Sequence, residues 1–99
     1  MARTDDPVVI TGYARTPMGG FMGDFAALSA SELGLVATKG ALARSGLDPQ
    51  AVEQLYFGCV LPAGQGQAPA RQVALGAGLP LSTGAVTLNK MCGSGMMAA

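Results

Sequence analysis

The chain has 99 residues, a formal net charge of zero, and neither histidine nor tryptophan. Apolar residues make up 49% of the sequence and charged residues only 12%, about half of the usual charged share. So small a share of charged residues is typical of one layer of a larger protein or of a subunit of an oligomer. The absence of a basic cluster argues against nucleic acid as a partner, because binding to phosphates needs a positive face.

The sequence also gives no sign of a membrane segment. No apolar run approaches the roughly 18 residues of a membrane span. Residues 1–7 form a polar N-terminal tail without the apolar centre of a signal peptide. We therefore predict a cytoplasmic protein that has no contact with a membrane.

The chain has two cysteines, Cys59 and Cys92, and their thiols are its most reactive side-chain groups. Their spacing is not that of a zinc site, and the chain has no histidine, so no metal or bound cofactor is predicted. Two free thiols are expected rather than a disulfide. Cys59 stands inside an apolar run and is predicted to be an ordinary core residue.

The first half of the chain predicts a strand followed by a helix. Residues 8–11 (VVIT) have the continuous β-branched pattern of a strand buried on both faces. Ser29 and Glu32 have the spacing of a capping box, which predicts a helix that begins after Ser29. Gly46 is suited to its C-terminal cap.

The second half repeats the alternation. Residues 55–61 read as a second buried strand, residues 70–77 as a second helix, and residues 85–88 as a third strand that leads into a turn and a helix start. Arg71 either anchors a turn or a subunit contact, or is an ordinary surface arginine. This series predicts an α/β fold with a parallel sheet, represented here by the first β-α-β-α-β and the start of a helix. Because that last helix has barely two turns, we predict that residues 8–99 are an incomplete domain of a longer protein.

Cys92 lies at the corner between the third strand and the last helix, and three interpretations compete for it. In the first, Cys92 is a nucleophile whose thiolate is favoured by the helix N-terminus, and backbone N–H groups nearby cradle an oxyanion. In the second, Gly93-x-Gly95-x-x-Ala98 is part of the dinucleotide fingerprint of an oxidoreductase, although the required acidic residue would lie beyond the chain. In the third, Cys92 is an inert buried cysteine of a structural or interaction fragment.

Three stretches together resemble the N-terminal part of the thiolases, the family of acetyl-CoA acetyltransferase and 3-ketoacyl-CoA thiolase. They are residues 14–23 (ARTPMGGFMG), residues 58–72 (GCVLPAGQGQAPARQ) and residues 89–96 (NKMCGSGM). Their order and spacing also match the family. The Asn-x-x-Cys-Gly-Ser-Gly element is specific, because the cysteine of the related ketoacyl synthases has different neighbours. The resemblance covers residues 8–99 but only the opening part of a family chain.

The resemblance implies a thiolase fold, in which two similar βαβαβαββ halves form layered sheets and helices. It implies that Cys92 is the nucleophile that becomes acylated, and that the backbone N–H of Cys92 is one of the oxyanion donors. The reaction would be a Claisen condensation of acetyl-CoA, or its reverse, the thiolysis of a 3-ketoacyl-CoA in fatty acid metabolism. Coenzyme A thioesters are then substrates, and no cofactor-binding residue is predicted.

The family's activating histidine and second cysteine lie in segments that this chain does not contain, so the 99-residue chain alone is predicted to be inactive. The resemblance also implies a homodimer or homotetramer. The strand at residues 85–89 and the loop at residues 62–71 would then be interfacial. Chain-length preference and reaction direction stay open at this point.

Overall fold

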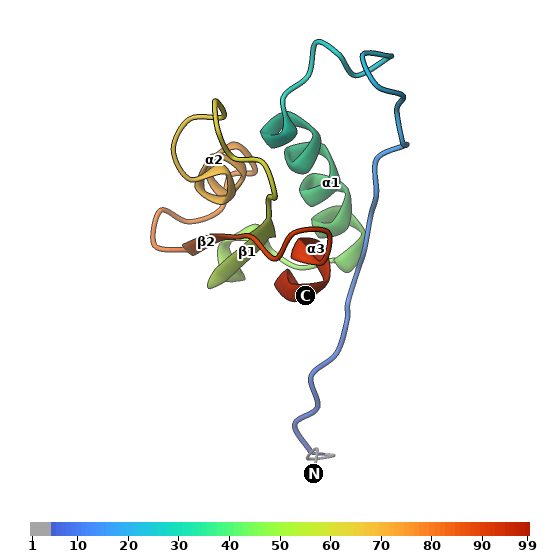
Figure 1. Cartoon of the computed structure of the whole chain (residues 1–99). Helices are drawn as coiled ribbons and strands as arrows, with labels where there is room; N and C mark the ends of the chain where they lie inside the picture. The colour runs from blue at the N-terminus through green and yellow to red at the C-terminus, as the bar shows by residue number, and fades with distance from the viewer. Residues whose placement is uncertain (1–4) are drawn as a thin grey trace.

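A computed structural model describes residues 5–99 of the chain. Its elements are α1 (Ala30–Ser45), the short 3-10 helix η1 (Pro49–Ala51), β1 (Gln54–Gly58), α2 (Pro69–Gly76), β2 (Gly84–Leu88) and α3 (Ser94–Ala98). Figure 1 shows α1 and α2 side by side, the two strands next to them, and α3 close to β1.

The strands β1 and β2 form a two-stranded parallel sheet. Gln54 stands opposite Gly84, and the pairing continues in register to Gly58 opposite Leu88. α2 connects the two strands, as expected for a parallel pair, which cannot be joined by a tight turn. The predicted α/β class with a parallel sheet is therefore confirmed, and the second and third predicted strands are both present.

The helix α1 begins and ends where its capping residues predict. The backbone N–H of Ser29 donates to Glu32 Oε2 at 2.6 Å, and the N–H of Glu32 donates to Ser29 Oγ at 3.1 Å, which completes the capping box. At the other end Gly46 has a φ of 71°, a left-handed conformation that glycine adopts without a steric penalty.

The predicted strand at residues 8–11 is not formed, and this prediction is wrong for the structure described. These residues have no regular secondary structure, and Val8 and Ile10 are almost completely exposed. Figure 1 shows the segment as an extended trace that runs past α1 and away from the other elements. The physical reason is that a strand needs a hydrogen-bonded neighbour, and β1 and β2 pair only with each other within residues 5–99.

The helices lie on both faces of the sheet. Phe57 contacts Gly34 of α1, whereas the next residue, Gly58, faces Ser94 of α3. Because successive strand residues point to opposite faces, α1 and α3 lie on opposite sides of β1. The buried apolar residues among those described are few and lie in or beside α2: Pro69, Ala70, Val73, Ala74 and Leu79. Within residues 5–99 no helix is long and apolar enough to cross a membrane.

Candidate active site

Cys92 lies in the turn that joins β2 to α3, as the sequence predicts. The strand ends at Leu88 and the helix begins at Ser94, so the cysteine stands two residues before the first helical residue. It is a free thiol and it is exposed to solvent. The prediction of a buried cysteine, made in the third interpretation, is therefore wrong for this structure.

The turn before Cys92 is held by the side chain of Asn89. Its Oδ1 accepts a hydrogen bond from the N–H of Met91 at 2.9 Å, and its Nδ2 donates to the carbonyl of Val60 at 3.3 Å. The first bond is a local turn that asparagine forms readily. The second ties the turn to the segment that follows β1. Met91 itself has a φ of 47°, a left-handed conformation that is unfavourable for a residue other than glycine.

Ser94 closes the same turn from the helix side. It is buried, and its Oγ accepts a hydrogen bond from the N–H of Lys90 at 2.9 Å and donates one to the carbonyl of Met91 at 2.6 Å. The sequence did not lead us to predict this role. A serine at the first turn of a predicted helix is the signal that could have suggested it.

None of these hydrogen bonds involves the backbone N–H of Cys92. No residue within 5–99 accepts a hydrogen bond from its backbone N–H, whereas the neighbouring N–H groups of Met91, Gly93 and Ser94 all have partners. An exposed thiol next to an unpaired N–H is an arrangement that can attack a carbonyl and then donate to the oxygen that becomes negatively charged. The remaining requirement is a base. The chain contains no histidine, the side chain that most often serves as such a base.

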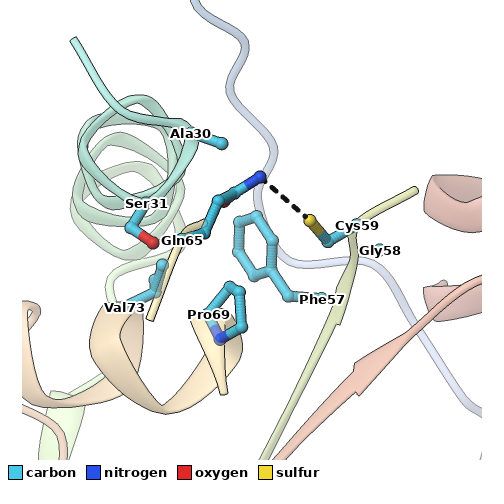
Figure 2. A pocket seen from close by; sticks show the side chains of 8 residues that line it. All are labelled: Ala30, Ser31, Phe57, Gly58, Cys59, Gln65, Pro69 and Val73. Carbon is cyan, nitrogen blue, oxygen red and sulfur yellow. Dashed lines mark hydrogen bonds between the residues drawn. The ribbon is translucent and has the colours of Figure 1, made fainter. Parts of the chain in front are cut away.

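Cys59 lies elsewhere, in a pocket between α1, β1 and the loop before α2. Figure 2 shows the eight residues that line the pocket, with the Gln65 side chain pointing toward Cys59. Gln65 Nε2 donates to the Cys59 sulfur at 3.6 Å and to the Leu61 carbonyl at 2.6 Å. Cys92 does not line this pocket. Cys59 is half-buried and follows the last residue of β1, so it is less enclosed than the core residue that the sequence predicts.

Arg71 proves to be a residue that anchors a turn, which was one of the alternatives. Its guanidinium donates from Nη1 to the Thr83 carbonyl at 3.0 Å and from Nη2 to the Leu81 carbonyl at 3.1 Å. It thereby fixes the connection between α2 and β2, and so the position at which the strand leading to Cys92 begins. In the described part of the chain, no group of three or more His, Cys, Asp or Glu side chains is placed to hold a metal ion.

Comparison with known proteins assigns the chain to a family. The profile of the thiolase N-terminal domain matches residues 8–99. The chain belongs to the thiolase family. It is 54% identical over 89 residues to the mitochondrial acetyl-CoA acetyltransferase of Danio rerio, and 55% identical over 91 residues to acetyl-CoA acetyltransferase 2 of Arabidopsis thaliana. These matches cover 90% and 92% of this chain.

Solved thiolase structures agree with the fold. Acat5 thiolase of Ascaris suum, solved in complex with coenzyme A, matches 90% of this chain with a TM-score of 0.89 and 44% identity. Acetyl-CoA acetyltransferase of Syntrophomonas wolfei matches 91% with the same TM-score and 36% identity. The chain spans less than a quarter of the length of these relatives, between 21% and 23%.

Proposed function

We propose that this chain supplies the nucleophile of a thiolase that acts on acetyl-CoA or 3-ketoacyl-CoA through Cys92. The observation that carries the proposal is the exposed Cys92 thiol beside its unpaired backbone N–H, in a turn of a thiolase N-terminal domain. The names of the relatives support acyl transfer from acetyl-CoA, and the Ascaris suum structure contains coenzyme A. The alternative of a dinucleotide-dependent oxidoreductase has no such support.

In the proposed reaction, the Cys92 sulfur attacks the carbonyl carbon of an acyl-CoA, and the carbonyl oxygen becomes an oxyanion next to the Cys92 N–H. Collapse of this adduct expels the thiolate of coenzyme A and leaves an S-acyl cysteine. In the synthetic direction, the α-carbon of a second acetyl-CoA, deprotonated by a base, attacks that thioester. In the degradative direction, the Cys92 sulfur attacks the 3-keto carbonyl of a 3-ketoacyl-CoA, the bond between C2 and C3 breaks, and the acetyl-CoA carbanion that leaves is protonated by an acid. Coenzyme A then attacks the S-acyl cysteine, which releases the shortened acyl-CoA and the Cys92 thiolate. The base belongs to residues outside this chain, so the 99-residue chain alone is proposed to be inactive.

The assembly and location are also proposals. We place the strand at residues 85–89 and the loop at residues 62–71 in the interface of a homodimer or homotetramer. Their support is that β2 has an unpaired edge within the described sheet and that most of this loop is exposed. The names of relatives include both a mitochondrial and a cytosolic enzyme, and a cytoplasmic location stays a prediction for this chain.

A chimeric enzyme tests the role of Cys92. In this chimera, residues 8–99 replace the matching stretch of the Danio rerio acetyl-CoA acetyltransferase. Incubation with acetyl-CoA followed by intact-mass measurement should show one acetyl adduct. The adduct should be absent from the Cys92→Ser chimera and retained in the Cys59→Ser chimera, which is the matched control. Equal labelling of the Cys92→Ser chimera and the unchanged chimera would show that another residue is the nucleophile.

A further inference from the structure

Gln65 has its side-chain amide inside the protein, although the loop around it is exposed. Among residues 62–68, Gln65 is half-buried and its Oε1 atom is buried, whereas the other residues are exposed to solvent. Figure 2 shows this side chain in the pocket between α1, β1 and the loop before α2, where it points toward Cys59. Because a buried amide that loses its hydrogen bonds is unfavourable, the bonding partners of this group fix its position.

The backbone of Gln65 is anchored to α2. Gln72, a residue of α2, donates from its Nε2 to the carbonyl of Gln65 at 2.7 Å and to the carbonyl of Gln67 at 2.9 Å. The N–H of Gln65 donates to the carbonyl of Pro62 at 3.1 Å, which closes a turn. Since α2 contains most of the buried apolar residues among those described, Gln65 is attached to the packed part of the chain.

From this anchored position, the Gln65 side chain holds the segment that follows β1. Its Nε2 donates to the Leu61 carbonyl at 2.6 Å and to the Cys59 sulfur at 3.6 Å. A side-chain amide nitrogen carries two hydrogens, so these two bonds use both of its donors. The two acceptors belong to the residues before and after Val60, and the amide therefore restrains the backbone on both sides of Val60.

Val60 is in turn bonded to the turn that carries Cys92. The carbonyl of Val60 accepts a hydrogen bond from Asn89 Nδ2 at 3.3 Å, and Asn89 Oδ1 accepts one from the N–H of Met91 at 2.9 Å. Met91 is the residue before Cys92. Because resonance keeps an amide group planar, a displacement of the Val60 carbonyl is passed through the Asn89 side chain to the Met91 N–H.

We propose that Gln65 is a positioning residue for Cys92, which acts through residues 59–61 and the side chain of Asn89. Its influence is indirect, since Cys92 does not line the pocket that holds the Gln65 amide. The proposal rests on the proposed function, because attack by Cys92 requires that its thiol and its N–H are held in place. A Gln65→Met substitution approximately keeps the length of the side chain and removes both donors.

The rate of acetylation tests this role in the chimera that contains residues 8–99. At saturating acetyl-CoA, Gln65→Met should lower the rate constant about fivefold or more, because a small displacement of a reacting group slows a reaction strongly. The half-saturating concentration of acetyl-CoA and the final amount of adduct should change less than about twofold, since neither substrate binding nor folding depends on Gln65. Gln50→Met is the matched control, because Gln50 Nε2 donates to the Gly78 carbonyl at 3.4 Å, beyond the opposite end of α2.

A double-mutant cycle tests the path through Asn89. Asn89→Ser keeps an oxygen that can accept the bond from the Met91 N–H, but its side chain is too short to reach the Val60 carbonyl. In the Asn89→Ser chimera, Gln65→Met should therefore lower the rate by less than a further factor of about two. An unchanged rate in Gln65→Met, a loss of final adduct at an unchanged rate, or equal reductions in the two backgrounds would each overturn the proposal.

Hydrogen–deuterium exchange separates this role from the proposed chemistry, because it requires no acylation. The Asn89 side chain protects the Met91 N–H, so exchange in residues 89–94 should be about threefold or more faster in Gln65→Met than in Gln50→Met. Equal exchange in these two variants would also overturn the proposal. Faster exchange in Gln65→Met, together with no acetyl adduct on the unchanged chimera, would support the role of Gln65 and contradict only the proposed function.

Discussion

Gly58 of β1 lies directly against the backbone of Ser94, the first residue of α3. A Cβ added at Gly58 would lie 2.5 Å from the carbonyl carbon of Ser94 and 2.7 Å from the nitrogen of Gly95. Only glycine allows this approach, because the atoms in the way belong to backbone and cannot rotate aside. The contact sets the height of α3 above the sheet, and with it the position of the turn that carries Cys92.

Replacement of Gly58 by alanine should therefore displace α3 and slow the acylation of Cys92. In the chimera we expect Gly58→Ala to reduce the rate of acetylation about tenfold or more, because a shift of about 1 Å at a reacting group has large effects on rate. Rapid-quench mass measurement of the acetyl adduct provides the rate. Gly20→Ala is the control, since a Cβ there meets nothing within 4 Å. An unchanged rate in Gly58→Ala would mean that α3 does not fix the nucleophile.

Removal of the Ser94 hydroxyl should loosen the turn. The Ser94→Ala substitution removes the acceptor of the Lys90 N–H and one of the two donors to the Met91 carbonyl, which keeps its bond from the Ser94 N–H. Each lost bond costs about 0.5–1.5 kcal/mol. We expect a lower melting temperature of the chimera in scanning calorimetry and slower acetylation of Cys92. Ser82→Ala, at an exposed serine, should change neither property. Equal melting temperatures for the two variants would contradict the role assigned to Ser94.

Arg71 should be replaceable only in part by lysine. Arginine donates to the Thr83 and Leu81 carbonyls from two nitrogens of one rigid group, a geometry that the single ammonium group of lysine cannot reproduce. Arg71→Met should destabilise the chimera by about 1.5–3 kcal/mol, and Arg71→Lys by less. Arg15→Met is the control, because Arg15 bonds only to the carbonyl of its neighbour Thr16. Urea denaturation, monitored with a spectroscopic probe placed within residues 8–99, measures the difference in the free energy of unfolding between the variants.

The 99-residue chain by itself should lack a cooperative melting transition. Its buried apolar core within the described residues consists of five residues, four of them in α2, while large side chains such as Phe21, Val8 and Met96 are almost fully exposed. So small a core does not offset the conformational entropy of about 100 residues. Calorimetry of a monomeric sample should show no sharp endotherm. The chain in that sample should also bind a hydrophobic dye. A sharp, reversible transition would contradict this expectation.

Local signals in the sequence correctly predicted the capped helix α1 and the turn at Cys92. The capping box joins Ser29 to Glu32, and the side chain of Asn89 binds the N–H of Met91 two residues later. Such bonds connect residues that are close in the chain, so their spacing is visible in the sequence. The family motif around Cys92 is likewise formed by residues that are close in the chain, so it is visible in the sequence.

The structure differs from the sequence-based expectation where distant residues must meet. The β-branched residues 8–11 form no strand, because strand formation depends on a neighbour and not on composition alone. The N-terminus of α2 also has no side-chain cap of its own. Instead, the hydroxyl of Thr87 in β2 accepts the bond from the N–H of Ala70 at 2.9 Å. No pattern within α2 itself could indicate this bond.

The sequence by itself thus determined the family and the local geometry that places Cys92 at a strand-to-helix corner. The tertiary structure alone decided that α3 packs against Gly58, and that Arg71 and Thr87 fix the crossover between the strands. The physical reason is the range of the interactions. Hydrogen bonds between near neighbours follow from residue type and spacing, whereas contacts between layers depend on how the whole chain fills space.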